Sequence, residues 1–218
     1  MAKLADHPLY GNEGLVKELS EWLLSHGHTV LQMFQFGGDE KEHSLKLLEM
    51  LDVRRVETVL SLGCGIGGME AYWKKEDPYL KFDLVNTSTA QLEMCLCEGK
   101  RICHDAETYQ YRDGIYDLVV MAYVLGHVDA EKTLRNALRN TGFGGYLFIY
   151  DVFDGTKHFR ETLYYNTPKL KEMERFGVEN DLRFLRVIEG GIPLSRLMKS
   201  EVPWAEKECT PALFIFEV

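Results

Sequence analysis

The sequence lacks the long apolar runs that a membrane-spanning helix requires. Its apolar stretches are short, such as YLFIY at residues 146–150, whereas a spanning helix needs about 20 apolar residues. The first ten residues, MAKLADHPLY, contain no apolar stretch of the kind found in signal peptides. We therefore expect a cytoplasmic protein with no membrane span.

Basic residues are scarce relative to acidic ones. The 218 residues include 25 Lys and Arg against 34 Asp and Glu, a formal net charge of −9, and they form no local basic patch. Such a charge repels the phosphates of nucleic acids and the head groups of anionic lipids. The charge balance predicts no nucleic-acid partner and favours a small-molecule substrate.

Cysteine is sparse and lacks the spacing of a metal site. Five cysteines occur, with no pair of CxxC motifs among them: Cys64, Cys95, Cys97, Cys103 and Cys209. An odd number of cysteines without that spacing is typical of reduced thiols rather than of a disulfide framework or a zinc site. We expect no metal.

The sequence does contain a regular alternation of apolar strands and amphipathic helices. Strands are expected at 56–62, 81–86, 101–104, 116–125, 145–153, 182–188 and 211–218, and helices at 12–26, 39–51, 67–76, 88–99, 129–142 and 167–176. This alternation predicts an α/β fold, a mostly parallel sheet with helices on both faces. Ligands of such sheets bind at the carboxyl ends of the strands, where the strand order reverses.

The chain divides into two expected parts. Residues 1–52 form an N-terminal helical lid, and residues 53–218 form the main domain, with an acceptor lid around 154–180. The first helix should bury one stripe of apolar residues, which consists of Leu15, Leu19, Trp22 and Leu23. A helical cap over the sheet edge, or a contact surface for a homodimer, is the alternative interpretation of residues 12–51.

A glycine-rich stretch, SLGCGIGG at residues 61–68, follows the first expected strand and precedes a helix. Gly63, Gly65 and Gly68 fit the pattern GxGxxG in the context that this pattern requires. Glycine permits a tight turn and lets the backbone approach a ligand, and the helix start offers free N–H groups to an anionic group. The pattern predicts a site for a nucleotide-like cofactor. A tight turn whose glycines serve only packing is the alternative.

The end of the second strand bears on which cofactor binds. A nicotinamide site normally carries an acidic residue there, about 20 residues after the glycines, to hold the ribose hydroxyls. Asn86 occupies that place. An amide can still form hydrogen bonds with a hydroxyl but carries no charge. Asn86 therefore argues against an NAD-dependent oxidoreductase, which remains an alternative.

Four segments in order resemble the class I S-adenosylmethionine-dependent methyltransferases over about residues 30–153: VLSLGCGIGG, FDLVNTSTAQLEMC, HDAETY and YDLVVMAYVLGHVDAEKTLRNALRNTGFGGYLFIYDVF. The resemblance implies a Rossmann-like, seven-stranded, mostly parallel sheet with the final strand antiparallel, and S-adenosylmethionine as cofactor. The doubled glycine and the run NTSTAQ look like the branch that contains cyclopropane fatty-acid synthases and small-molecule C-methyltransferases.

The resemblance also assigns cofactor contacts. It implies that the methionine part lies along Gly63, Cys64, Gly65 and Gly67, the ribose at Asn86 and Thr87, the adenine at Asp105, Ala106 and Glu107, and the sulfonium above Ala122 and Tyr123. Gln91 belongs to this set as the partner of Ser88 in capping the next helix. Phe36 lies in MFQFGG, which is similar to an aromatic and glycine segment folded over the cofactor.

Two positions depart from the family, Ser61 and Asn86, and Asn86 stands in place of the usual acid that holds the ribose. Many members carry an acid where Ser61 stands, and that acid orients the amino group of the methionine part. Ser61 and Asn86 together also fit a noncatalytic protein that binds S-adenosylmethionine or another nucleoside.

The candidate catalytic residues are His127 and Tyr123, close to the end of the fourth strand. His127 has an ordinary pKa near about 6.5 and could act as a base, or could only fix its loop. The Tyr123 ring could favour the cationic sulfonium, or could be core packing. Asp151, Glu161, Tyr164 and Tyr165 are further candidates for a base. The sequence thus predicts methyl transfer to a small acceptor, with carbon methylation slightly favoured over oxygen or nitrogen.

Overall fold

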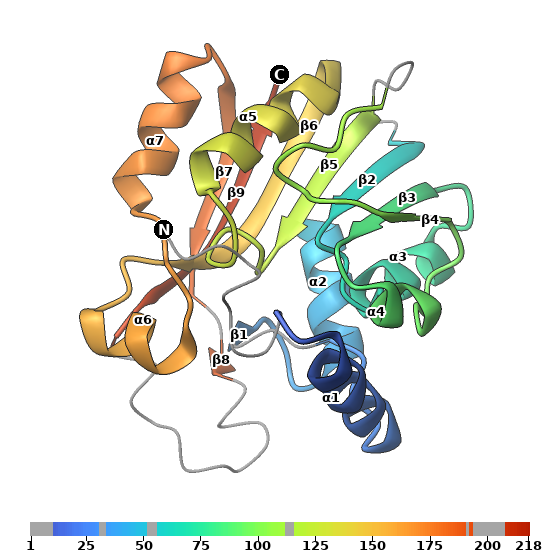
Figure 1. Cartoon of the computed structure of the whole chain (residues 1–218). Helices are drawn as coiled ribbons and strands as arrows, with labels where there is room; N and C mark the ends of the chain where they lie inside the picture. The colour runs from blue at the N-terminus through green and yellow to red at the C-terminus, as the bar shows by residue number, and fades with distance from the viewer. Residues whose placement is uncertain (1–10, 31–33, 52–55, 112–115, 191, 194–207) are drawn as a thin grey trace.

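The computed structural model describes residues 11–30, 34–51, 56–111, 116–190, 192–193 and 208–218. Its centre is a seven-stranded sheet (Figure 1), whose strands are β2 (Thr58–Leu62), β3 (Lys81–Asn86), β4 (Lys100–Cys103), β5 (Tyr116–Ala122), β6 (Thr141–Phe153), β7 (Arg183–Glu189) and β9 (Thr210–Glu217). The strand order is β4-β3-β2-β5-β6-β9-β7. Two short strands, β1 (Phe34–Gln35) and β8 (Ile192–Pro193), pair with each other in a separate antiparallel ladder.

The direction of the strands confirms the predicted Rossmann-like, mostly parallel sheet. The ladders β2–β3, β2–β5, β3–β4 and β5–β6 are parallel, and β9 runs antiparallel to both of its neighbours. The chain passes from β2 to β3 on one side and returns to β5 on the other. The carboxyl end of β2 therefore lies at the point where the strand order reverses, which is where open α/β sheets bind ligands.

Successive residues of the central strands are buried on opposite faces of the sheet. Leu60 and Leu62 belong to the core on the side of α5 (Ala130–Asn140) and α7 (Leu170–Glu179). Val59 belongs to the core on the side of α2 (Glu40–Leu51) and α3 (Gly68–Glu76). Strands buried on both faces need apolar residues at every position, which explains the uninterrupted apolar runs of the sequence.

The helix α1 (Glu13–Ser25) buries a different face from the one predicted. Leu15 and Trp22 are 44% and 47% exposed, whereas Val16, Ser20 and Leu23 are buried. The helix lies beside α4 (Thr89–Glu93) rather than on the sheet (Figure 1). Its acidic first residue, Glu13, accepts hydrogen bonds from Ser88, Thr89 and Ala90. The contact with a polar helix start selects this face.

The helix α4 is shorter than predicted because the residues that follow it pack against the glycine loop and β3. It ends at Glu93, and Leu96 then donates its N–H to the carbonyl oxygen of Ile66 at 2.9 Å. Gly99 passes close to β3, where a Cβ atom would lie 2.5 Å from the carbonyl oxygen of Phe82. The segment after α4 therefore packs under the glycine loop instead of continuing as a helix to Gly99.

The segment after β6 contains a helix that the sequence did not reveal, α6 (Lys157–Leu163). The next helix, α7, begins at Leu170 rather than at Thr167, whose hydroxyl accepts the N–H of Gly155. It continues through Gly177, which was expected to end it. A Cβ atom there would lie 2.5 Å from the ring of Phe184, so this glycine allows close packing of helix on strand. In the described residues no helix is long and apolar enough to span a bilayer.

Candidate functional site

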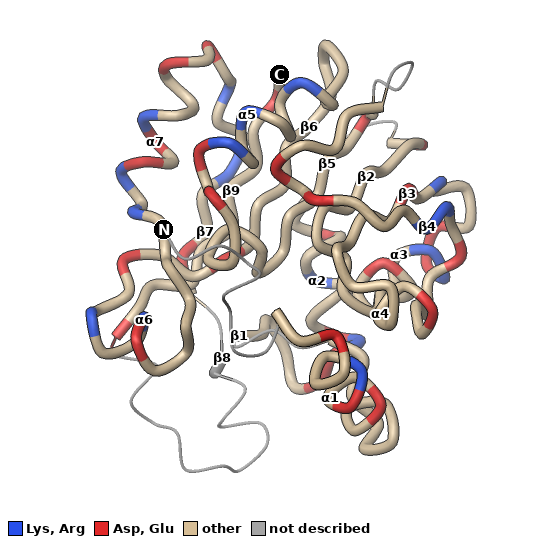
Figure 2. The backbone as a smooth tube through the Cα atoms, in the orientation of Figure 1, with Lys and Arg blue, Asp and Glu red and all other residues tan. Residues whose placement is uncertain are grey.

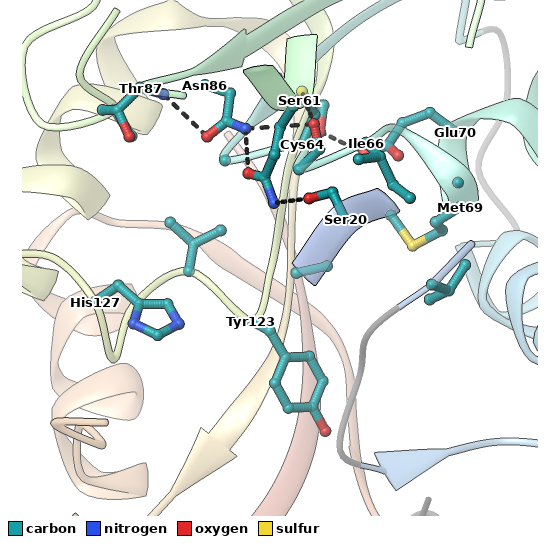
Figure 3. A pocket seen from close by; sticks show the side chains of 18 of the residues that line it. Ser20, Ser61, Cys64, Ile66, Met69, Glu70, Asn86, Thr87, Tyr123 and His127 are labelled. Atoms are coloured by element: carbon teal, nitrogen blue, oxygen red, sulfur yellow. Dashed lines mark hydrogen bonds between the residues drawn. The ribbon is translucent and has the colours of Figure 1, made fainter. Parts of the chain in front are cut away.

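A pocket opens at the carboxyl ends of β2, β3, β4 and β5 (Figure 3). The structure places twelve of the predicted site residues in its wall: Ser61, Gly63, Cys64, Gly65, Asn86, Thr87, Gln91, Asp105, Ala106, Ala122, Tyr123 and His127. Three predicted site residues, Phe36, Gly67 and Glu107, do not line it. The strand ends therefore bring most of the candidates together, as the sheet topology requires.

The glycine loop turns sharply with three left-handed residues. Gly63, Gly65 and Gly67 have φ of 75°, 57° and 65°, a region that residues with a Cβ rarely adopt. A Cβ atom at Gly63 would lie 2.6 Å from Val124, whereas one at Gly65 would meet no atom within 4 Å. Gly65 therefore presents bare backbone to open space in the pocket, and it is the best-placed residue for a backbone contact with a ligand.

The other two glycines of the stretch are required by packing within the protein. A Cβ atom at Gly67 would lie 2.5 Å from the sulfur of Cys95, and one at Gly68 would lie 1.9 Å from the carbonyl oxygen of Thr29. Gly67 thus faces the chain after α4. Gly68 allows the segment after α1 to reach the start of α3, so the packing alternative holds for these two positions.

Asn86 fastens the glycine loop to the neighbouring strand. Its side-chain amide donates to the carbonyl oxygen of Gly65 at 3.3 Å and to Oε1 of Gln91 at 2.8 Å, while its Oδ1 accepts the N–H of Thr87 at 2.9 Å (Figure 3). Gln91 in turn donates to Ser20 of α1 at 3.4 Å. Asn86 therefore links the loop, α4 and α1, in addition to the ribose contact that the resemblance implies.

The wall also contains a carboxyl group that the sequence reading missed. Glu70, in the first turn of α3, is 4% exposed and accepts a hydrogen bond from the hydroxyl of Ser61 at 2.5 Å. Burial raises the pKa of the Glu70 carboxyl above its ordinary value. No motif includes this position. An acidic residue in the first helical turn after a glycine loop could nevertheless have indicated a carboxyl group in the site.

The segment after β4 contributes two predicted residues and turns the third away. Asp105 and Ala106 line the pocket. Glu107 instead accepts the N–H of Asp129 at 2.7 Å and lies 3.9 Å from the Nζ of Lys132. Its side chain thus organises the start of α5, and its assignment to the adenine edge stays a prediction.

An aromatic group closes the pocket next to β5. Tyr123 adopts the left-handed region with φ of 58°, and its ring packs edge-on against Tyr150 at 5.4 Å. Its hydroxyl accepts the N–H of Phe34 at 2.9 Å, and burial raises the pKa of the Tyr123 phenol well above its ordinary value. Phe36 packs behind this group, 5.3 Å from Tyr150, and does not reach the pocket. Tyr123 is therefore a neutral aromatic wall.

Of the two candidate bases His127 and Asp151, only His127 lines the pocket. The His127 ring lies edge-on to Tyr165 at 4.6 Å. Asp151 is buried and accepts hydrogen bonds from the N–H groups of Val124, Leu125 and Val152 and from the hydroxyl of Tyr165. These donors occupy both carboxylate oxygens, so Asp151 shapes the turn after β5 instead of acting as an available base.

Residues from the N-terminal segment complete the wall, and sequence motifs gave no sign of them. They are Leu19, Ser20, Leu23, His28, Thr29 and Val30. Glu40 of α2 holds this segment, because its carboxylate accepts the N–H groups of Thr29 and Val30 and the hydroxyl of Thr29. In the described part of the chain no three His, Cys, Asp or Glu side chains come together as a metal site.

Comparisons with known proteins agree with this geometry. A family profile described as "Methyltransferase domain" matches residues 60–149. The crystal structure of the cyclase SpnF superposes with a TM-score of 0.74 at 12% identity, covering 96% of this chain and 95% of that one. No curated protein matches the sequence.

Two further solved structures have the same fold. Geranyl diphosphate C-methyltransferase from Streptomyces coelicolor A3(2), solved with Mg²⁺, geranyl diphosphate and S-adenosyl-L-homocysteine, gives a TM-score of 0.68 at 15% identity over 100% of this chain and 87% of that one. Phosphoethanolamine N-methyltransferase 2 from Haemonchus contortus gives 0.73 at 16% identity over 98% and 59%.

The family match covers the strands and the glycine loop that form the pocket, and the solved structures share the whole fold. Residues 60–149 thus match a methyltransferase-domain profile, and the described fold is the one that these solved structures share.

Proposed function

We propose that the protein transfers the methyl group of S-adenosylmethionine to a small-molecule acceptor, with carbon methylation slightly favoured over oxygen or nitrogen. The observation that carries the proposal is the open backbone of Gly65 at the reversal point of the sheet, where a Cβ atom would meet no protein atom. In this placement Asn86 and Thr87 hold the ribose, Asp105 and Ala106 flank the adenine, and the methionine part lies along Gly63, Cys64 and Gly65.

Tyr123 is proposed to lie beside the sulfonium. The methyl group moves in a displacement at carbon: the bond from the acceptor forms as the bond to sulfur breaks, and the sulfur becomes neutral. An aromatic face favours the cationic sulfonium, and the phenol of Tyr123 stays neutral because burial raises its pKa. Positioning and exclusion of water supply much of the catalysis in such a transfer.

The groups near the acceptor side support carbon methylation. Asp151 is saturated with hydrogen bonds and Tyr123 is neutral, which leaves His127 as the described titratable side chain in the wall beside β5. An alkene attacks through its π electrons, so no proton has to leave before the new carbon–carbon bond forms; the resulting carbocation then loses a proton, and His127 is the described side chain placed to accept it. An alkene therefore needs less from a general base at the moment of transfer than a protonated oxygen or nitrogen does.

A small acceptor suits the wall of the pocket. Residues of α1 and of the segment 28–30 line it from the side opposite the strand ends, which limits the size of what can enter. Among the lining residues that the structure describes there is no Lys or Arg. In the view of Figure 2, acidic and basic residues are interspersed along α7 and α5 and form no continuous basic stripe. These features favour a small acceptor over a nucleic acid.

Several finer predictions belong to the same proposal. We propose that residues 1–52 act as a lid through α1, that the region around 154–180 faces the acceptor, and that the protein works in the cytoplasm. A homodimer built through the N-terminal helices remains part of the proposal. Gel filtration with light scattering measures the last point directly.

Titration calorimetry tests the proposal. S-adenosylmethionine and S-adenosylhomocysteine should bind, and NAD should not; binding of NAD alone would contradict the cofactor assignment. Transfer of a radioactive methyl group from S-adenosylmethionine to a panel of small alkenes, phenols and amines then tests the reaction. The second candidate, a noncatalytic cofactor-binding protein, is favoured by the absence of an acid at Ser61, and it predicts binding without formation of S-adenosylhomocysteine.

A further inference from the structure

Glu70 is a buried carboxyl group in a ligand pocket and has no cationic partner among the described residues. It is 4% exposed and lines the pocket, and the hydroxyl of Ser61 is the side chain that binds it. The ion pairs of the described chain do not include it. His28, in the same wall, pairs with Glu40 at 3.1 Å. A carboxylate in this position is costly unless a proton or a ligand cation compensates it.

The described residues around Glu70 supply no cation that pairs with it. A hydrogen bond with Cys95 and burial raise the pKa of the Cys64 thiol, burial raises the pKa of the Cys97 thiol, and the nearby charge of Glu70 adds to both. Lys74, one turn further along α3, directs its ammonium to the carbonyl oxygens of Pro78 and Leu80 instead. A positive group that enters the pocket would therefore meet a carboxyl group that no described Lys, Arg or His side chain pairs with.

The position of Glu70 matches one end of the cofactor. In Figure 3 it lies on the side of the pocket opposite Asn86 and Thr87, next to Ser61 and beyond the glycine loop. If the ribose lies at Asn86, as the proposed function holds, the methionine part extends toward Glu70. This part ends in a primary ammonium group, which forms a strong charge-assisted hydrogen bond with a carboxylate.

We infer that Glu70 binds the α-ammonium group of the methionine part of the cofactor, and that Ser61 orients the Glu70 carboxylate for this contact. The inference rests on the proposed function. The acid that the strand end lacks at Ser61 is thus supplied from the first turn of α3, nine residues later in the chain. The departure of Ser61 from the family then does not by itself argue for a protein without cofactor affinity.

The test compares ligands that differ at the ammonium group. S-adenosylhomocysteine, its desamino analogue and 5′-methylthioadenosine, which lacks the whole amino-acid part, are titrated into wild-type protein by calorimetry. A hydrogen bond to a charged group is worth enough that loss of the ammonium should weaken binding about 10- to 100-fold. Equal binding of S-adenosylhomocysteine and its desamino analogue would overturn the inference, and this comparison needs no variant.

Variants assign the effect to Glu70. Glu70→Gln should weaken S-adenosylhomocysteine about 10- to 100-fold and leave 5′-methylthioadenosine within about twofold. Glu76→Gln, on an exposed residue of the same helix, is the matched control and should bind both ligands like wild type. The double variant Ser61→Asp with Glu70→Gln moves the carboxylate to the strand and should recover most of the lost affinity.

The outcomes separate the two proposals. A Glu70→Gln protein that binds S-adenosylhomocysteine like wild type, or that loses both ligands equally, overturns the role of Glu70 and leaves methyl transfer standing. Wild-type protein that binds neither adenosyl ligand overturns the proposed function together with this inference. Thermal unfolding of each variant verifies that the binding data come from folded protein.

Discussion

Substitution of Gly65 tests whether the glycine loop contacts the cofactor. Gly65 has φ of 57°, and a Cβ atom there would enter open space, so Gly65→Ala adds a methyl group to the pocket without a clash inside the protein. The expected cost to stability is the left-handed backbone of alanine, about 1–2 kcal/mol. For a chain of this length that corresponds to a decrease in Tm of about 2–8 °C.

A matched control separates strain from loss of the contact. Gly144, near the start of β6 and remote from the pocket, has φ of 74°, and a Cβ atom there would also meet nothing within 4 Å. Gly144→Ala should therefore lower the Tm by a similar amount. Only Gly65→Ala should weaken S-adenosylmethionine, by at least about tenfold or 1.4 kcal/mol, because a methyl group occupies the space of a ligand in backbone contact.

Calorimetry for affinity and differential scanning fluorimetry for Tm measure the two effects independently. Gly65→Val, which adds a larger side chain to the same space, should abolish binding in a protein that still folds. Wild-type affinity in a folded Gly65→Ala protein would refute the reasoning, because the loop would then not be the surface that the cofactor contacts. Equal loss of affinity in both alanine variants would attribute the effect to stability alone.

Three other substitutions have expected outcomes. Asn86→Ala removes hydrogen bonds that fasten the loop, so it should lower the free energy of unfolding in urea by about 1–3 kcal/mol and weaken cofactor binding. Wild-type stability and affinity in this variant would show that these hydrogen bonds contribute to neither. Gly68→Ala must displace the carbonyl oxygen of Thr29, which a Cβ atom would approach to 1.9 Å, and should lower the Tm more than Gly65→Ala does. Burial alone would raise the pKa of Asp117, yet hydrogen bonds from residues 57 and 58 outweigh it and hold the pKa below its ordinary value. Its ionised form therefore stabilises the fold above about pH 4, and this contribution is lost as the pH falls through the lowered pKa. Asp117→Asn should be less stable than wild type at pH 7, with the difference shrinking toward pH 3; a difference that stays constant over this range would contradict the assignment.

The sheet could be predicted from sequence because its central strands are buried on both faces. A stretch such as YLFIY is apolar at every position, which only a covered sheet or a buried helix requires, and its short length selects the strand. The parallel order of β4, β3, β2, β5 and β6 then places their carboxyl ends at one edge of the sheet. This is why residues as distant in sequence as Gly65 and Tyr123 could be assigned to one pocket.

The remaining site residues depend on contacts that sequence spacing does not encode. Gly67 has the same pattern as Gly65, but the sulfur of Cys95 explains its lack of a side chain. Glu107 lies only two residues after Asp105, yet its side chain turns to Asp129 across the fold. The stripe on α1 failed for a similar reason, because its partner is a polar helix start rather than the apolar sheet.

The contact between Gly68 and Thr29 has a consequence for how the protein can be dissected. Glu13 joins α1 to the start of α4, and Thr29 touches the start of α3, so the chain ahead of the sheet is attached on both flanks of the glycine loop. A shortened protein that begins at residue 56 would retain every strand of the main sheet but would have a rebuilt ligand cavity. Affinities measured on such a fragment would therefore not be those of the binding site in the full chain.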